Sequence, residues 1–314
     1  MAVKNETRER LARLLDEVAV NEGIHPTLVE GVGVCRHSSS LPRTSVVYEP
    51  IIVFVGQGRK RSYLGDQVYV YDPSTYFVLS VPLPAECEWD ATPENPVLVL
   101  GIKIDSATLG EVILAMDEPL PPLREMPRAV TTHSLSDQLS SAVIRLLECL
   151  KSPLDSRMLG RQIVREIIYR VLREDQDGAL RALANRNGNF MQIARVLKEV
   201  HADSAKPMTV ESMSKRAAMS VAAFHHNFKL VTGSSPLQYL KRIRLDRAKR
   251  LMVHDGHNAS TAAKAVGYES ASQFSREFKR QFGVTPMEDV QRLRELAEAS
   301  ARKPTKTTAK KTSR

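Results

Sequence analysis

A segment in the second half of the chain occurs twice, and this repeat is the feature that most constrains the fold. Residues 220–236 and 270–286 align at an offset of 50 and share the pattern Ser-x3-Phe-x3-Phe-Lys-x3-Gly-x2-Pro. Serine is a good helix N-cap, glycine favours a helix end, and proline favours the start of the next helix. Two phenylalanines four residues apart lie on one helix face and can anchor it in a small core. The repeat therefore predicts two helices of the same design.

A shorter helix and a tight turn are expected before each copy. In the first copy Thr209 can cap a helix at residues 210–216, and a turn of three residues follows. In the second copy Ser260 can cap a helix at residues 261–266, and a turn of the same length follows. A helix, a short turn and a second helix make the helix-turn-helix arrangement. A plain helical bundle is the alternative, but it does not explain why the same caps and anchors recur in a basic segment.

The second helix of each copy has an inward and an outward face. We expect the inward face to hold Val221, Phe224 and Phe228 in the first copy and Ala271, Phe274 and Phe278 in the second. The outward face, expected to contact DNA, holds Ala222, His225, His226, Lys229, Ser272, Gln273, Ser275, Arg276 and Lys279. An arginine can pair bidentately with guanine and a glutamine with adenine, and a histidine can donate to or accept from base edges. The two lysines at the helix ends are expected to contact phosphates.

A longer helix is predicted between the two copies, starting at Pro236 and ending before Gly256. Its apolar stripe is predicted to consist of Leu237, Leu240, Leu245, Ala248, Leu251 and Met252. About 17 helical residues span roughly 25 Å. The two recognition helices could then lie about one duplex turn, roughly 34 Å, apart. Arg244 interrupts the stripe, and either a phosphate contact or an internal ion pair would explain it.

The charge of the chain is divided unevenly. Residues 186–314 contain 25 Lys+Arg and 11 Asp+Glu, whereas residues 1–185 contain 20 and 25. An acidic half joined to a basic half is expected of a nucleic-acid-binding module attached to another domain. A solvated surface with a basic tail is the alternative. The tail at residues 302–314 holds six basic residues, but residues 186–301 still carry a net charge of +8 without it.

Signals for other protein classes are missing from the sequence. No apolar run reaches the ~18 residues of a membrane span, and the charged N-terminus does not have the apolar stretch of an export signal. We therefore expect a soluble cytoplasmic protein that binds no membrane. The cysteines Cys35, Cys87 and Cys149 are unclustered, so no disulfide framework, metal site or cofactor is expected. Cys35 and His37 could share a metal, and Cys35 could be a sensor thiol, but a small buried hydrophobe is the favoured interpretation.

The first half of the chain changes from helical to β patterns and back. A helix is expected at residues 3–20, and short apolar runs at residues 28–104 predict an antiparallel sandwich or small barrel. A proline-rich loop at residues 82–96 is expected to interrupt the strands. Helices at residues 134–150 and 154–173 could close the core or form a dimer seam. The polar stretch 174–189 is the expected linker.

Residues from about Gln192 to Arg292 resemble the DNA-binding domain of the AraC/XylS family of bacterial transcription regulators. The resemblance rests on the two repeats, on the run from Pro236 to Met252, and on the motif from Ala263 to Arg276. It implies that both helix-turn-helix units dock in adjacent major grooves. By resemblance, base contacts come from the positions of Ala222, His225, His226, Ser272, Gln273 and Arg276. The sequence departs from the family at Ser214, where a small apolar residue is more usual.

The N-terminal half resembles the cupin-like effector domain of one AraC subgroup. The resemblance rests on residues 54–60, Gly65-Asp66, 71–76 and 80–84. It implies a small-molecule site in a barrel, although the chain contains no His-x-His of the kind that metal-binding cupins carry. The expected fold class is multidomain α+β, with an antiparallel cupin-like β barrel, flanking helices and an all-α C-terminal domain. The expected regions are a helical segment at 1–27, the barrel at 28–113, a helical dimerisation and linker region at 114–180, the DNA-binding domain at 192–292 with helix-turn-helix units at about 209–230 and 259–282, and a disordered basic tail at 300–314.

These observations favour a sequence-specific DNA-binding transcription regulator that is not an enzyme. Its expected partners are double-stranded DNA, an unidentified small-molecule effector and a second copy in a homodimer, with RNA polymerase as a candidate. A small molecule, or a thiol reaction at Cys35, would act through the barrel or the helices at residues 134–173. The alternative is a cupin-type enzyme with a DNA-binding appendage, which needs a metal set or an acid–base pair that the sequence does not offer. A sequence-neutral DNA packer fits the lysine-rich tail but not the repeated recognition helices.

Overall fold

The fold was obtained as a computed structural model, which describes residues 5–65, 67–117, 125–175, 178–184, 188–202 and 208–292. The tail expected at residues 300–314 lies outside these ranges. The described residues form two compact units. The amino-terminal unit extends to Leu240, and the carboxyl-terminal unit begins at Lys241 within the same long helix.

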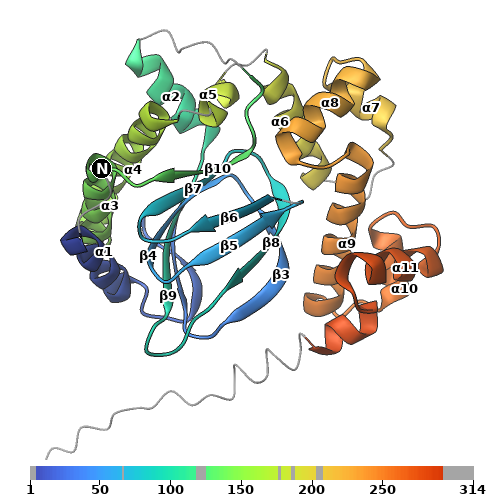
Figure 1. The fold of residues 1–314 in the computed structure, drawn as a ribbon, viewed down its shortest axis with the longest axis horizontal. Coiled ribbons are helices and arrows are strands. Elements are labelled where there is room, and N and C mark those ends of the chain that lie inside the picture. Colours follow the sequence, from blue (N-terminus) through green and yellow to red (C-terminus); the bar gives the residue numbers. More distant parts are fainter. Residues whose placement is uncertain are drawn as a thin grey trace, which may run out of the picture. The chain divides into compact units, whose positions relative to one another are not determined.

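Two antiparallel sheets make up the β domain of the amino-terminal unit (Figure 1). The larger sheet has the strand order β1-β2-β9-β4-β7-β10 and the smaller sheet the order β3-β8-β5-β6. The strands of the larger sheet are β1 Gly23–Pro26, β2 Val32–His37, β4 Ile51–Gln57, β7 Thr75–Leu79, β9 Val97–Lys103 and β10 Val130–Ser134. Those of the smaller sheet are β3 Leu41–Tyr48, β5 Lys60–Leu64, β6 Gln67–Tyr71 and β8 Leu83–Trp89. The α+β fold class is confirmed, and the described strands form a two-sheet sandwich rather than a closed barrel.

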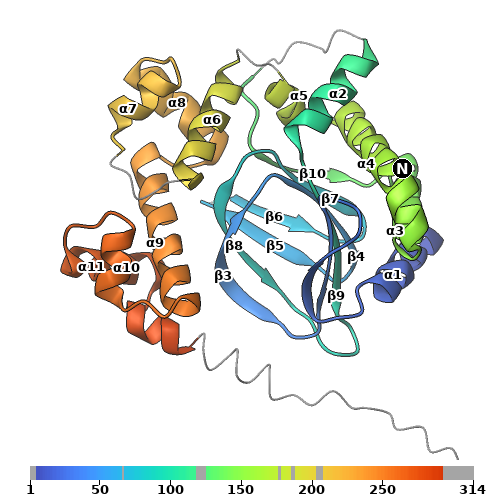
Figure 2. The ribbon, with the colours of Figure 1, turned by 180° about the vertical axis from the view of Figure 1, so that it is seen from behind.

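The larger sheet is buried on both faces. Ile52, Phe54 and their neighbours on one face join a core with helices α1, α3 and α4, which Figures 1 and 2 show along that side of the sheet. On the opposite face, the ring of Phe77 stacks on Tyr71 of the smaller sheet at a centroid distance of 4.7 Å. Burial on both sides explains why β4 and β9 read as continuous apolar runs instead of an alternating pattern.

The helices of this part of the chain are α1 Asn5–Val18, α2 Ser106–Met116, α3 Asp137–Leu150, α4 Pro153–Glu174 and α5 Ala179–Ala184. Local sequence explains where α4 begins, because Ser152 caps it and Pro153 occupies its first turn. The helix expected at residues 3–20 is present as α1, and the helices expected at 134–150 and 154–173 are present as α3 and α4. No helix in the described ranges has the length and apolar character needed to cross a bilayer.

The proline-rich loop expected at residues 82–96 is wrong in its first half, because strand β8 runs through it. Pro84 pairs with Val47 of β3, whereas the pairing of β8 with β5 begins only at Glu86. Proline cannot donate a ladder hydrogen bond, but at Pro84 the strand has a neighbour on only one side. Strand β8 therefore accommodates Pro84 in a segment where it is an edge strand.

The linker expected at residues 174–189 is also wrong in part, because α5 folds within it. Leu180 of α5 is fully buried in the same core as α3 and α4. The carboxylate of Asp175 accepts hydrogen bonds from the backbone N–H groups of Gly178 and Leu180, both at 3.0 Å. Strand β10 likewise lies in a stretch that we expected to be helical, and both elements are too short to give a clear periodicity.

The remaining helices are α6 Asn189–Ala202, α7 Val210–Arg216, α8 Val221–Thr232, α9 Pro236–His254, α10 Ala259–Ala265 and α11 Ala271–Phe282. A further helical stretch covers residues 286–292. The first helix-turn-helix, α7 and α8, belongs to the amino-terminal unit, and the second, α10 and α11, belongs to the carboxyl-terminal unit. Helix α9 begins at Pro236, as the sequence predicts.

Tyr239, in the first turn of α9, ties the first helix-turn-helix to the β domain. Its hydroxyl donates to the backbone oxygen of Pro82 at 2.7 Å and lies 2.6 Å from Nε2 of His201 on α6. Because the hydroxyl hydrogen goes to Pro82, Nε2 of His201 must be the donor in the second bond. The tyrosine ring packs edge-on against Phe228 of α8, with the centroids 5.3 Å apart.

Replacing Tyr239 by phenylalanine tests this connection, because it keeps the ring and removes only the hydroxyl. We expect Tyr239→Phe to lower the free energy of unfolding of the amino-terminal unit by about 1–3 kcal/mol, since it removes the hydrogen bond to the buried oxygen of Pro82 and one hydrogen bond of the half-buried His201. Urea denaturation followed by the fluorescence of Trp89 measures this, because Trp89 is the only tryptophan of the chain. Tyr169→Phe on the exposed side of α4 is the matched control. An unchanged unfolding midpoint for Tyr239→Phe would contradict the assigned bonds.

Candidate nucleic-acid interface

Helix α8 is held by caps at both ends and by the turn that precedes it. The turn after α7 contains Ala218 with a φ of 53°, a left-handed conformation that closes the corner between the two helices. Ser220 then caps α8, and its side chain accepts from the backbone N–H of Ala223 at 3.2 Å. Gly233 ends the helix with a φ of 74°. The capping roles predicted for Thr209, Ser220 and Gly233 are confirmed.

Helix α11 repeats this construction with one change. Ser270 caps it by accepting from the backbone N–H of Gln273, and Gly283 ends it with a φ of 77°. The cap of the preceding helix α10 is Asn258, whose side-chain oxygen accepts from Thr261 at 2.8 Å. The prediction of Ser260 as this cap is therefore wrong. Asparagine caps as well as serine does, and it starts the helix early enough to place Ser260 inside the first turn.

The phenylalanine pairs anchor both helices as predicted. Phe224 and Phe228 are fully buried with ring centroids 5.3 Å apart, and Phe274 and Phe278 are fully buried with centroids 5.6 Å apart. Val221 was expected beside them but is 41% exposed. Ala271, at the equivalent position of α11, is exposed as well. Both residues stand at the first position of their helix, where the chain has not yet turned onto the core.

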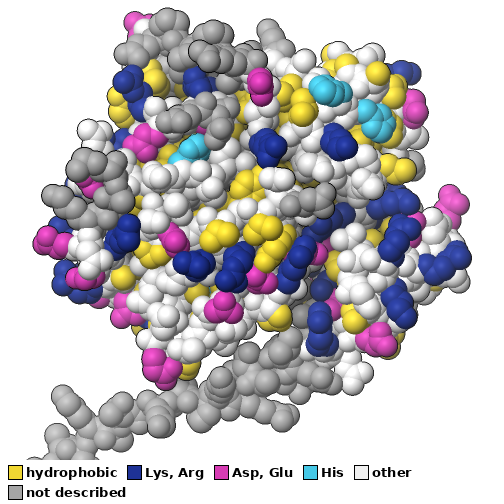
Figure 3. Space-filling model, in the orientation of Figure 1, with side chains coloured by type: hydrophobic (Ala, Val, Ile, Leu, Met, Phe, Trp, Pro, Cys, Tyr) yellow, Lys and Arg dark blue, Asp and Glu magenta, His cyan; other side chains and the backbone are white. Residues whose placement is uncertain are grey.

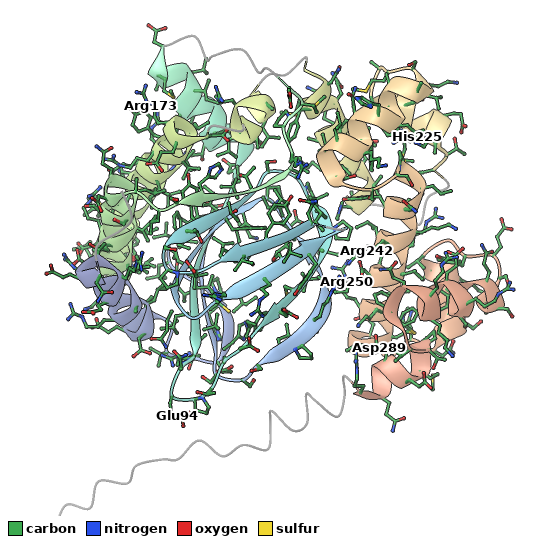
Figure 4. All side chains as sticks on the ribbon, in the orientation of Figure 1. Glu94, Arg173, His225, Arg242, Arg250 and Asp289 are labelled. Atoms are coloured by element: carbon green, nitrogen blue, oxygen red, sulfur yellow. The ribbon has the colours of Figure 1, made fainter. Side chains whose placement is uncertain are left out.

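The structure exposes the residues expected to contact DNA, with one partial exception. The exposed residues are Ala222, His225, His226 and Lys229 on α8 and Ser272, Gln273, Arg276 and Lys279 on α11. Figure 4 shows His225 on the solvent side of α8. Ser275 is half-buried, and its hydroxyl donates to the backbone oxygen of Ala271 at 2.9 Å. Ser275 is therefore the least available member of the set.

A buried carboxylate lies directly behind the exposed face of α11. Glu277 accepts from the hydroxyl of Tyr268 at 2.8 Å and forms an ion pair with Nζ of Lys241, on α9, at 2.9 Å. Burial alone would raise the pKa of Glu277, but the hydrogen bonds from Lys241, Tyr268 and Gln273 outweigh it and hold the pKa below its ordinary value. Glu277 thus fixes α11 to α9 and holds the amide of Gln273, which donates to it at 3.4 Å.

The first helix-turn-helix has no counterpart of this ion pair at the same position of the repeat. Asn227 occupies the place of Glu277, and its side-chain amide donates to the sulfur of Met219 at 3.6 Å. The sequence analysis missed Glu277 and its two partners. A signal was present, because an acidic residue between two inward phenylalanines is unusual in a helix that is otherwise basic.

Positive charge is concentrated in the described part of the carboxyl-terminal unit. Residues 241–292 contain 11 Lys+Arg and 6 Asp+Glu. Figure 3 shows Lys and Arg side chains gathered over α9, α10 and α11 on the face in view. One of the acidic residues, Asp289, is fully buried and already pairs with Nζ of Lys249 at 2.7 Å. This pair removes one charge of each sign from the surface, so the net charge of +5 for residues 241–292 is unchanged, and such an excess is expected for a phosphate-binding surface.

The apolar stripe predicted on α9 is largely buried, but Leu237, its first predicted residue, is not part of the core. Leu240, Leu245, Ala248 and Met252 are buried, whereas Leu237 is 52% exposed. Tyr239 and Ile243 take its place in the core. Leu237 lies in the first turn of the helix, where the hydrogen bond from Tyr239 to Pro82 sets which side is buried.

Comparisons with known proteins agree with this architecture. Residues 28–179 match a family model described as the N-terminus of AraC-type transcriptional regulators, and residues 213–292 match a helix-turn-helix domain. An AraC-like transcription regulator of Streptomyces lividans is 30% identical over 194 residues, which are 61% of this chain and 62% of that protein. The RCS-specific HTH-type transcriptional activator RclR of Escherichia coli is 40% identical over 89 residues, 28% of this chain and 31% of RclR. The chain therefore spans less than two thirds of the length of these relatives.

One solved structure shows the same fold over most of the chain. It is that of ToxT from Vibrio cholerae strain SCE256 with a bound unsaturated fatty acid, at a TM-score of 0.56 and 13% identity, covering 82% of this chain and 94% of that one. The chain belongs to the AraC/XylS family of transcription regulators.

The Glu277 ion pair gives a pH-dependent prediction. We expect Glu277→Gln to lower the free energy of unfolding by about 1–3 kcal/mol at pH 7. Because the folded-state pKa of Glu277 is depressed, its stabilisation is fully present above the ordinary value of 4.5 and is lost as the pH falls through the folded-state pKa. The difference between parent and variant should therefore shrink below that pH. Circular dichroism melts from pH 7 down to pH 3 measure it.

Glu269→Gln, at an exposed position just before α11, is the control and should change little across this range. A constant difference between Glu277→Gln and the parent over the whole range would mean that the charge of Glu277 is not what stabilises α11.

Proposed function

We propose that the protein is a sequence-specific DNA-binding transcription regulator that acts in the cytoplasm and is not an enzyme. The observation that carries this proposal is the pair of short helices, α8 and α11, each capped and anchored by two buried phenylalanines and exposing a polar face. The family supports it, since the matching models describe AraC-type regulators and a helix-turn-helix domain. Reading two successive major-groove faces is the role we infer for the two helices.

The two faces would read different bases. On α11, Arg276 can form a bidentate pair with guanine and Gln273 can pair with adenine. On α8, the adjacent His225 and His226 can donate to or accept from base edges. Lys229 and Lys279, in the last turns of their helices, would contact phosphates and so position the helices without specifying sequence.

We further infer that a small molecule controls DNA binding through the β domain. Support comes from the fold, because ToxT, which shares it, has been solved with a bound unsaturated fatty acid. A physical route exists within the amino-terminal unit, where Tyr239 bonds to Pro82 and the backbone N–H of Ala129 donates to the oxygen of Val231 at 3.2 Å. A change in the strands and loops around these residues would therefore reach the first helix-turn-helix directly.

A homodimer is the assembly that we propose, with α4 as the contact surface. The first turns of α4 expose Leu154, Met158 and Leu159, which are uncommonly apolar for a solvated helix face. Leu154 and Met158 are one helical turn apart and lie on the same side. A second copy that covers this strip would remove it from water, and the dimer would present two DNA-binding domains to two sites on the DNA. RNA polymerase is a candidate partner of the DNA-bound dimer.

Charge reversal at Arg276 tests the recognition face. We expect Arg276→Glu to lose the discrimination of one base pair of the operator, a change of about 1–3 kcal/mol, because a good bidentate pair is worth that much. The operator is first isolated by selecting bound fragments of genomic DNA, and affinities for all single-base variants are then measured. Arg13→Glu, an equal charge change at an exposed position of α1, is the control. Unchanged operator binding by Arg276→Glu would refute the assigned face.

Replacement of Met158 tests the dimer. Met158→Glu should shift the protein towards monomer in sedimentation velocity, because a charge would be buried without a partner. Met158→Leu keeps the surface apolar and should leave the dimer intact. Equal sedimentation of all three proteins would place the dimer contact elsewhere.

A further inference from the structure

A cavity of about 890 Å³ lies within the amino-terminal unit, in the β domain and under the adjoining segments of α2 and α4. Strands of both sheets line its inner part, the larger sheet through Val53 and Val99 and the smaller one through Tyr48 and Tyr71. Gly33 and Gly101 also line it and are direct partners across β2 and β9, so two neighbouring positions of the wall have no side chain. The size and the mostly apolar wall are typical of a small-molecule site.

One charged side chain, that of Lys60, stands in the inner wall. Its residue is only 9% exposed, and Nζ lies 4.7 Å from the ring centroid of Trp89, the neighbouring residue on β8. Within the ranges that the structure describes, no carboxylate lies within 4 Å of this ammonium group. Buried lysines normally pair with an anion, because a charge removed from water is otherwise unfavourable. The aromatic face of Trp89 compensates only a part of that cost.

The polar groups next to Lys60 are neutral at physiological pH. Burial and the nearby lysine lower the pKa of His37 to about 4, and burial raises the pKa of Cys35 to about 11. His37 is stacked on Trp89 and lies 3.0 Å from the sulfur of Cys35. Glu22 approaches the other ring nitrogen of His37 only to 4.0 Å and remains half-exposed outside the cluster. Lys60 is therefore the one cation of this cluster, without an internal counter-ion among the described residues.

We propose that this cavity binds an amphipathic monocarboxylate, with the carboxylate on Lys60 and the apolar body between Val53, Val99 and the two tyrosines. One lysine matches one negative charge, and a phosphate would need more donors than this end of the cavity provides. A sugar is disfavoured as well, because its many hydroxyls would be left unpaired against valine walls. The proposal rests on the proposed function in one respect, namely that the bound acid is the effector.

Matched acids and alcohols test the charge preference. The full-length protein is titrated with decanoate and 1-decanol, and with 4-phenylbutanoate and 4-phenyl-1-butanol, and the fluorescence of Trp89 reports binding. We expect each acid to bind about 10- to 100-fold more tightly than its alcohol, the ratio that a charge-assisted hydrogen bond gives. Equal affinities for acid and alcohol, or no binding of either acid, would overturn the proposal.

Variants of two lysines show which of them causes the preference for the acid over the alcohol. Lys60→Met should bring the acid-to-alcohol ratio to about one while alcohol binding persists. Lys103→Met, at the exposed rim of the same cavity, should leave the ratio unchanged. Loss of the ratio in Lys103→Met but not in Lys60→Met would overturn the assignment. Val99→Phe fills the cavity without touching the lysine and should abolish binding of both ligands, and retained binding would place the site elsewhere.

Isothermal titration of decanoate separates this proposal from the proposed function. Binding of the acid is measured first without DNA, and the affinity for the selected operator is then measured with and without saturating acid. Acid binding that depends on Lys60 but leaves operator affinity unchanged would uphold the site and overturn its role as the effector site. Loss of sequence-specific DNA binding in all conditions would overturn the proposed function and leave the ligand site standing.

Discussion

Burial of a phenylalanine pair is the interaction on which the DNA-binding half depends. The helices α7 and α10 have seven residues each, and α8 and α11 have twelve, lengths at which an isolated helix is marginal in water. Two aromatic side chains one turn apart give each second helix enough apolar contact to fix its orientation. Because the rings occupy one side, the residues on the opposite side, among them His226 of α8 and Arg276 of α11, face outward. The exposed faces of α8 and α11 are thus a consequence of how the helices are anchored.

The sequence predicts best those features that are set by local chemistry. Thr209, Ser220, Ser270 and the two terminal glycines act where their residue types indicate, because a cap involves only a few neighbouring residues. Prediction fails where distant contacts decide the outcome. Nothing near Pro84 reveals that its strand has a neighbour on only one side, and the core that receives Leu180 is assembled from helices far away in sequence. The base-contacting roles of the exposed residues remain predictions.

The β domain is built around a different constraint, the need to cover a sheet on two faces. Helices bury one face of the larger sheet, and the smaller sheet covers the other. Between the sheets lies the cavity, and the paired Gly33 and Gly101 of its wall contribute no side chain to it. The inner wall of the cavity also holds Lys60, and the ring of Trp89 beside it offsets only a part of the cost of burying that charge.

The two copies of the repeat share their caps and buried phenylalanines but differ in their outward residues. This difference defines an orientation of the protein on DNA. Helix α8 has two alanines and two histidines at positions 222, 223, 225 and 226, and α11 has serine, glutamine, serine and arginine at the equivalent positions 272, 273, 275 and 276. Under the proposed function, the two halves of the DNA bound by one protomer must then differ in sequence. A protomer can therefore dock on its site in only one orientation, with its β domain always towards the same flank. The order of bases in the site, read from one end, would decide on which side of the DNA-binding domain the rest of the molecule lies.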